Sequence, residues 1–200
     1  MNKKNNPYIK NSNLKDSKFL EDYWLRYKKI LFDSRDDEGL IDLRNQILLT
    51  QKKGGKLIFV GNGASASLAS HAATDFTKQA KIKAISFNDH NLITALSNDY
   101  GYENWVAKAL EYYAEPKDLL VLISVSGESL NLVNAVKYAN KFSIDTLSIT
   151  GFDKENSLNS LTNNSLWVDS KSYNIVESIH TIWITLIIDL IVGKFNYSVN

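Results

Sequence analysis

The sequence predicts a single α/β domain whose parallel sheet is covered by helices on both faces. The chain has 200 residues, which suits one large domain. From residue 56 onward, short apolar segments alternate with helical patterns, as in proteins built from strand–helix–strand units. The strongest strand candidate, residues 118–124, has five consecutive apolar residues, which is typical of a strand buried on both faces.

Two helices are predicted before the first strand. Apolar residues recur with a 3.6-residue period over 17–32, which indicates an amphipathic helix. A second helix follows, with Asp36 or Asp37 as its N-cap and the glycines at 54–55 as its end. Residues 1–13 are rich in Asn and Lys and are interpreted as a flexible lead.

The remaining elements alternate along the chain. Strands are expected at 56–60, 84–87, 118–124, 146–150 and, as a possible edge strand, 166–168. Helices are expected between them at 65–79, 102–114 and 129–141, and a long helix at 175–192 closes the chain. Because strand and helix alternate, the sheet is expected to be parallel.

The composition argues against several classes of function. Lys plus Arg number 23 and Asp plus Glu number 22, so the net charge is +1. This balance argues against a broadly basic nucleic-acid-binding protein and against a polybasic membrane-surface protein. The chain has no cysteine, which excludes disulfides, Cys-based zinc sites, iron–sulfur clusters and thiol nucleophiles. A cytoplasmic location is expected, and the absence of cysteine is compatible with it.

No targeting or membrane segment is predicted. The start of the chain lacks the apolar stretch of a secretory signal. The most apolar run, 179–192, is interrupted by polar residues that include His180, Thr181 and Thr185. Its apolar stretches are shorter than the ~18–20 residues that a membrane span needs. We interpret it as a helix buried in a core or in a subunit interface.

Two loops at predicted strand ends indicate a binding site, because ligands of open α/β sheets bind beyond the carboxyl ends of the strands. The first contains Asn62, Gly63 and Ser65 and leads into a helix, whose N-terminal N–H groups and dipole favour an anion. The second, residues 124–129, adds three serine hydroxyls and a glycine. Hydroxyl and amide donors can bind a phosphate monoester without Arg or Lys.

Each loop alone has a simpler interpretation. A Gly-Asn-Gly turn often only reverses the chain, and Ser65 or Ser129 alone is more often a helix cap than a ligand. Two such loops at strand-to-helix junctions together favour a phosphate or sugar site. Neither spells a dinucleotide or P-loop fingerprint, so no nucleotide cofactor is expected.

A third feature is the pair His71 and Asp75, four residues apart on one face of the predicted helix after the first loop. From spacing alone, a buried structural histidine and a solvated aspartate are the favoured interpretation. Together with the two loops and segments 98–101 and 176–180, this region resembles the SIS (sugar isomerase) domain. Within it, the chain is most similar to the phosphoheptose isomerase (sedoheptulose 7-phosphate isomerase) family, over residues 20–194.

The resemblance implies a fold and an assembly. The fold is a three-layer α/β/α SIS domain over residues 14–200, with a five-stranded parallel sheet, two N-terminal helices and a long C-terminal helix. The assembly is a homotetramer with active sites at subunit interfaces. The implied partner is a small phosphosugar, with no direct nucleic-acid or membrane partner.

The resemblance also implies a substrate site in which the second loop holds the phosphate, with backbone support that extends to Gly127. The expected substrate-binding residues are Asn62, Gly63, Ser65, Asp99, Ser124, Val125, Ser126 and Ser129. The implied reaction converts sedoheptulose 7-phosphate into D-glycero-D-manno-heptose 7-phosphate through an enediol, for bacterial surface glycans such as lipopolysaccharide. It needs a base, an acid and a group that polarises the oxygens.

Three positions depart from the family pattern. Asp75 stands where the family has a catalytic glutamate, and its carboxylate is set back by ~1 Å, which catalytic geometry tolerates poorly. Glu177 replaces a glutamine. Thr185 replaces the catalytic histidine, and threonine cannot shuttle protons near neutral pH. Glu177, expected on the same helix face as Thr185, and His180, expected at the rim of the site, are the candidates for the missing acid–base group beside Asp75.

A metal site is a further expectation. The family histidine at the position of His71 binds zinc in some members, and His71, Asp75 and Glu177, with His180 as a fourth candidate, could hold zinc or another divalent ion. Two other functions stay open. The substitutions at Asp75 and Thr185 favour a non-catalytic SIS protein that binds a phosphosugar or docks onto a partner, as replication-initiator-associating relatives do. An isomerase of a different phosphosugar would also explain them.

Overall fold

The computed structural model describes residues 12–196, and the chain divides into two compact units, Met1–Arg35 and Asp36–Asn200. The first unit contains helix α2 (Ser12–Lys28) and a π-helical turn, η1 (Lys29–Asp33). The predicted flexible lead lies outside the described residues, apart from residues 12 and 13, which belong to α2. Whether residues 14–200 form one folding domain stays a prediction.

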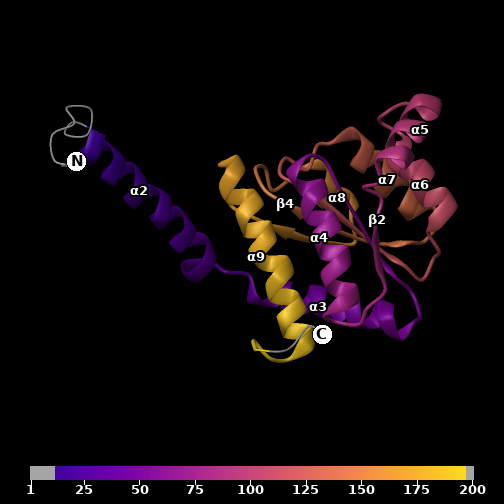
Figure 1. The fold of residues 1–200 in the computed structure, drawn as a ribbon, viewed down its shortest axis with the longest axis horizontal. Helices are drawn as coiled ribbons and strands as arrows, with labels where there is room; N and C mark the ends of the chain where they lie inside the picture. Colours follow the sequence, from indigo (N-terminus) through magenta and orange to yellow (C-terminus); the bar gives the residue numbers. More distant parts are fainter. Residues whose placement is uncertain (1–11, 197–200) are drawn as a thin grey trace, which may run out of the picture. The chain divides into compact units, whose positions relative to one another are not determined.

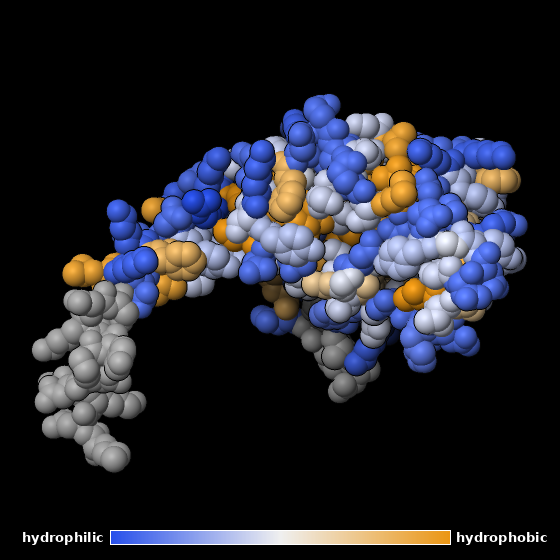
Figure 2. Space-filling model, turned by 90° about the horizontal axis from the view of Figure 1, so that it is seen from above, coloured by the Kyte–Doolittle hydropathy of each residue, from blue (hydrophilic) through white to orange (hydrophobic). Residues whose placement is uncertain are grey.

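Helix α2 leaves much of its apolar surface exposed. Phe19 is 66% exposed and Trp24 is 63% exposed. The orange side chains among blue ones at the left of Figure 2 belong to this first unit. Tyr23 and Tyr27 form an edge-to-face ring pair with centroids 5.3 Å apart. An exposed apolar and aromatic surface of this kind is typical of an interaction site.

The second unit confirms the predicted α/β class. Its five strands are β1 (Leu57–Gly61), β2 (Ala84–Ser86), β3 (Leu119–Ser124), β4 (Asp145–Thr150) and β5 (Asn164–Trp167). They form one parallel sheet in the order β2-β1-β3-β4-β5. Its helices are α3 (Asp37–Lys52), α4 (Ala64–Lys78), α5 (His90–Tyr100), α6 (Trp105–Tyr113), α7 (Leu130–Lys141), α8 (Ser157–Leu161) and α9 (Tyr173–Val192).

The helices form two layers on the sheet (Figure 1). Helices α4 and α9 pack against each other on one face, with α3 against α9. Helices α5 to α8 cover the other face, where alternate residues of β1 and β3, such as Ile58 and Leu120, join the core of that side. Both central strands are buried along their whole length, which is why they read as uninterrupted apolar runs.

The structure confirms one of the two candidate N-caps of the second predicted helix and corrects two other local predictions. The N-cap of α3 is Asp36, whose side chain accepts the N–H of Gly39 at 2.9 Å. Helix α5 was missed, and His90, expected in a loop, is its first residue, directly after the N-cap Asp89, whose side chain accepts the N–H of Leu92. Helix α8 was also missed, since five residues are too short to show a helical period.

Helix α9 is the one helix in the described part of the chain that is long and apolar enough to cross a membrane by length and composition. It has 20 residues, and its most apolar window has a mean hydropathy of 1.9 and is 44% buried. It packs on α3, α4 and β4 (Figure 1). Because its inner face fills the core, we assign it as a core helix, as the sequence predicted.

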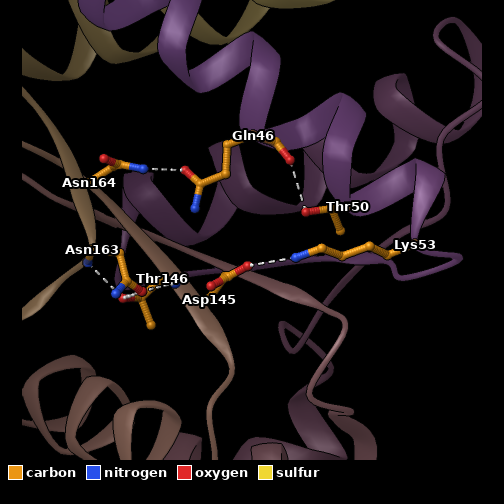
Figure 3. A network of polar contacts seen from close by, with 7 residues as sticks. All are labelled: Gln46, Thr50, Lys53, Asp145, Thr146, Asn163 and Asn164. Atoms are coloured by element: carbon orange, nitrogen blue, oxygen red, sulfur yellow. Dashed lines mark hydrogen bonds and ion pairs between the residues drawn. The ribbon is translucent and has the colours of Figure 1, made fainter.

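A polar network anchors α3 to the amino ends of β4 and β5 (Figure 3). Asn164 donates to the Oε1 atom of Gln46 at 2.9 Å, and Lys53 forms an ion pair with Asp145 at 3.6 Å. Asn163 accepts the N–H of Thr146 at 2.9 Å. These contacts stabilise the amino ends of β4 and β5. The candidate site lies at the opposite edge of the sheet, where the strands have their carboxyl ends.

Candidate active site

The topology of the sheet determines where a ligand can bind. Strand β1 lies between β2 and β3, so the connection after β1 and the connection after β3 leave the sheet on opposite faces. Gly61, the last residue of β1, is paired with Ile123, next to the end of β3. A crevice forms where the strand order reverses in this way, and it is the usual binding site of doubly wound sheets.

The first loop runs from Asn62 into α4. Gly63 is the N-cap residue of α4 and has φ +55° and ψ −125°, a conformation that only glycine adopts without strain. A Cβ at Gly61 would lie 2.6 Å from the backbone of Ser65. Ser65 is therefore a buried residue of the first turn of α4 and is not its cap, so the simpler interpretation of Ser65 is wrong.

The second loop follows β3 and leads into α7. The Oγ atom of Ser124 accepts the N–H of Gly127 at 3.1 Å and lies 3.5 Å from the Oγ of Ser129. Ser129 is the N-cap residue of α7, yet its side chain makes no capping hydrogen bond. Its hydroxyl is therefore directed toward Ser124 and does not serve the helix.

The two loops converge, as expected. They line a cavity of about 60 Å³, together with Ile123 and Tyr173, the first residue of α9. The lining residues are Asn62, Ser65, Ile123, Ser124, Val125, Ser126, Ser129 and Tyr173. All are uncharged, and the N-termini of α4 and α7 both open at this cavity. Such a set of hydroxyls and helix N-termini is suited to an anion.

A second cavity of about 290 Å³ shares Ser65 with the first. Glu177 contributes the only carboxylate among its lining residues, which are Ala64, Ser65, Leu68, Asn174, Glu177, Ser178, His180 and Thr181. Asn174, Ser178 and Thr181 were not predicted. They lie on the same face of α9 as Glu177, which helical spacing could have indicated.

His180 is among the residues that line the cavity beside Glu177, but its imidazole is buried against the sheet. The side chain has no exposed surface, and its Nε2 atom lies 3.1 Å from the carbonyl oxygen of Thr150, at the end of β4. Burial lowers the pKa of His180 from its ordinary value of 6.5 to about 4, although the bond to Thr150 acts in the opposite direction. A neutral, buried imidazole of this kind connects α9 to the sheet and does not exchange protons near neutral pH.

This burial predicts an acid-sensitive fold. An unfolded His180 takes up a proton near its ordinary pKa, and the folded one only near 4, so its stabilising effect is complete above pH 6.5 and is lost as the pH falls toward 4. Between pH 7 and pH 5 this should lower the free energy of unfolding by about 2 kcal/mol. Urea unfolding should show this fall in the free energy of unfolding in the wild type and in His90→Gln, a control at an exposed histidine. An equally steep loss in His180→Gln would contradict it.

The structure pairs His71 with Asp75 but does not bring them to Glu177. The Nε2 atom of His71 lies 2.9 Å from Asp75, whose side chain is 18% exposed. Neither residue lines the two cavities above. Asp99 is exposed, accepts a hydrogen bond from Asn98 at 2.9 Å and lines neither cavity.

The predicted metal ligands do not form a site in a single copy of the chain. Within residues 12–196, no three His, Asp or Glu side chains gather closely enough to hold a metal ion. The pair of His71 and Asp75 offers two ligands, fewer than the three protein ligands of catalytic zinc sites. These residues do not fit a zinc ion within one chain, and no catalytic step is derived through one.

Thr185 does not share a cavity with Glu177. It is exposed and lines a separate apolar groove of about 540 Å³ toward the end of α9, with Ile182, Leu186 and Leu190 among its neighbours. The eight-residue spacing predicted a shared helix face, but the cavity beside Glu177 ends at Thr181.

The fold is that of a doubly wound α/β protein with a cavity of uncharged, mostly hydroxyl-bearing side chains where the strand order reverses. The SIS domain family matches residues 28–151. A phosphoheptose isomerase of Helicobacter pylori (strain ATCC 700392 / 26695) is 33% identical over 180 residues, which cover 86% of this chain and 93% of the relative. Another phosphoheptose isomerase, from strain HPAG1 of the same species, is 36% identical over 152 residues, which cover 73% of this chain and 79% of the relative.

A solved structure agrees with these relatives. The phosphoheptose isomerase of Neisseria gonorrhoeae superimposes with a TM-score of 0.78 at 25% identity, over 91% of this chain and 98% of that one. The chain therefore belongs to the phosphoheptose isomerase family of SIS domain proteins. The predicted resemblance, the SIS fold and the class of sugar-phosphate isomerase are confirmed.

Proposed function

We propose that this protein interconverts sedoheptulose 7-phosphate and D-glycero-D-manno-heptose 7-phosphate. The observation that carries the proposal is the uncharged serine cavity between the N-termini of α4 and α7, next to a cavity that contains one carboxylate. Membership of a family of isomerases disfavours the alternative of a non-catalytic phosphosugar-binding protein.

In this proposal the second loop holds the phosphate. The hydroxyls of Ser124, Ser126 and Ser129 donate to its oxygens, and the N-terminus of α7 contributes a favourable dipole. Ser65 supplies a further hydroxyl from the first turn of α4. The absence of Lys and Arg from the lining is compatible with this role, since N–H and hydroxyl donors suffice for a phosphate monoester.

Glu177 is the proposed base. The phosphate is on C7 and the reacting carbons are C1 and C2, so the base must lie in a different part of the site from the phosphate. Glu177 lies in the adjoining cavity, which shares Ser65 with the phosphate cavity. It would remove the proton beside the carbonyl, and the resulting enediol would take a proton back on the neighbouring carbon.

We propose His71 and Asp75 as the source of the second proton-transfer group in an assembled homotetramer. The pair lies outside both cavities of one chain, and a site at a subunit interface could use it from a second copy. Two separate features support an assembly: the exposed apolar residues of α2 and the apolar groove beside Thr185 on α9. We further propose a cytoplasmic enzyme that supplies precursors for surface glycans such as lipopolysaccharide.

The direct test is an assay of the purified protein with sedoheptulose 7-phosphate, in which the aldose product is identified by NMR. Turnover supports the proposal. Tight binding of the ketose phosphate without turnover, with and without added zinc, would instead support the non-catalytic alternative. Turnover of a different phosphosugar only would limit the proposal to the reaction type.

Ser129→Ala should weaken substrate binding without a comparable loss of turnover. Hydrogen bonds to charged groups contribute about 1.5–3 kcal/mol, so KM should rise by about 10-fold or more while kcat changes by less than about 3-fold. The matched control is Ser67→Ala, an exposed residue of the first turns of α4 that lines neither cavity. An unchanged KM for Ser129→Ala would argue against a phosphate at this loop.

A further inference from the structure

Asn62, the first residue after β1, is connected to two residues that the sequence did not indicate as functional. It exchanges a pair of hydrogen bonds with Asn131 in the first turn of α7, each 3.0 Å long. The hydroxyl of Tyr102 donates to the same Oδ1 atom of Asn62, also at 3.0 Å. Asn131 is 2% exposed, whereas Tyr102 is 55% exposed.

Helix α7 holds both ends of this group. Asn134, one turn after Asn131, donates to the carbonyl oxygen of Glu103 at 3.0 Å, next to Tyr102. It also donates to Oδ1 of Asn104 at 3.3 Å. The short turn that contains Tyr102 and the loop that contains Asn62 are therefore both hydrogen-bonded to α7, the helix that follows the second loop (residues 124–129).

The count of hydrogen bonds defines what Asn62 can offer a ligand. An amide oxygen accepts two hydrogen bonds, and here both are supplied, by Asn131 and by Tyr102. The Nδ2 group has two hydrogens, of which one is donated to Asn131. The remaining capacity of the Asn62 side chain is a single N–H donor, and Asn62 lines the serine cavity.

We infer that Asn131 and Tyr102 are positioning residues that hold the Asn62 amide so that it presents an N–H group, and not its oxygen, to an anionic oxygen in the serine cavity. Without them the amide could rotate and place its oxygen against the phosphate. This inference rests on the proposed assignment of the phosphate to that cavity.

The test uses full-length protein with Asn131→Asp and Tyr102→Phe. An aspartate at 131 is nearly isosteric and still accepts from Nδ2 of Asn62, but it cannot donate to Oδ1 and it adds a negative charge. Tyr102→Phe removes a donor to the same Oδ1 atom without a change of charge. We expect KM for sedoheptulose 7-phosphate to rise by about 10-fold in Asn131→Asp and by about 3-fold in Tyr102→Phe, with kcat within about 3-fold of wild type. Inhibition by inorganic phosphate should weaken in proportion.

Two further variants separate positioning from a general structural effect. Asn140→Ala removes a comparable amide bond, to the carbonyl oxygen of Leu161 at 2.9 Å, from the far end of the same helix and should leave KM unchanged. In an Asn62→Ala background, the uncharged substitution Tyr102→Phe should cause little additional rise in KM, because its effect passes through Asn62. If the fold-increases in KM of Asn62→Ala and Tyr102→Phe multiply in the double variant, the two residues act independently and the inference is overturned. Wild-type KM and phosphate affinity in both Asn131→Asp and Tyr102→Phe would also overturn it.

The outcomes also distinguish the inference from the proposed function. Tyr102 is at the surface, so Tyr102→Phe is expected to fold even if Asn131→Asp does not. If the wild type binds inorganic phosphate but does not turn over the ketose phosphate, the proposed function fails. Phosphate affinities measured by calorimetry then still decide the inference: weaker binding in Tyr102→Phe supports it, and unchanged binding overturns it.

Discussion

Glu177→Gln is expected to lower kcat for sedoheptulose 7-phosphate by about 10²–10⁴-fold, the usual contribution of a positioned general base. Glutamine keeps the shape and hydrogen-bonding reach of the side chain but cannot take up a proton. KM should change by less than about 3-fold, because the proposed phosphate site is the neighbouring cavity, to which Glu177 does not contribute. Progress curves followed by NMR measure both constants.

The matched control is Ser178→Ala. Ser178 lines the same cavity, and its hydroxyl donates to the carbonyl oxygen of Asn174 at 2.8 Å within α9. Its kcat should stay within about 3-fold of wild type. If Glu177→Gln keeps wild-type kcat while Asp75→Asn loses it, Glu177 is not the base, and the proton is removed by the carboxylate on α4.

The sequence was informative where a residue's role depends on its near neighbours. The buried strands, the long closing helix and the two strand-end loops follow from local patterns, and β3 was predicted to within one residue. The convergence of the loops follows from a general property of parallel sheets, because their carboxyl ends lie at one edge. Helix α5 was missed although Leu92, Ile93 and Leu96 have helical spacing, because its N-cap, Asp89, was not recognised.

The sequence was less informative where a role depends on which side chain faces which. His180 lines the cavity beside Glu177, but its imidazole is buried against the carbonyl oxygen of Thr150, a contact between residues 30 positions apart that no local pattern shows. The bond between Asn62 and Asn131 joins residues 69 positions apart, which no local pattern reveals. The placement of His71 and Asp75 outside the two cavities is likewise a property of the fold, which no local pattern shows.

These placements change how the departures from the family pattern are interpreted. Glu177 lines a cavity next to the serine cavity, so this cavity contains a carboxylate. Thr185 faces an apolar groove, so the loss of a histidine at that position leaves the cavity of the same chain unchanged. The two substitutions are compatible with an enzyme whose acid–base group has moved along α9, and they do not by themselves indicate a loss of catalysis.

Gly127→Ala is expected to damage both the stability and the phosphate affinity of the protein. Gly127 has φ +69°, and a Cβ there would lie 2.0 Å from Oδ1 of Asn156. Asn156 cannot yield easily, because it is 1% exposed and donates to Thr150 at 3.1 Å and to Asp153 at 2.7 Å. The free energy of unfolding should fall by about 2–4 kcal/mol, from backbone strain together with the displaced amide network.

The same substitution at Gly54 separates strain from collision. Gly54 has φ +76°, and a Cβ there would meet nothing within 4 Å, so Gly54→Ala should cost about 1 kcal/mol and leave KM unchanged. Gly127→Ala should instead raise KM by more than about 10-fold, because the Oγ atom of Ser124 is held by the N–H of Gly127. Urea unfolding measures the loss of stability of both variants, and steady-state kinetics measures their KM values. Equal destabilisation and equal KM values in Gly127→Ala and Gly54→Ala would mean that the contact with Asn156 does not determine the conformation of the second loop, residues 124–129.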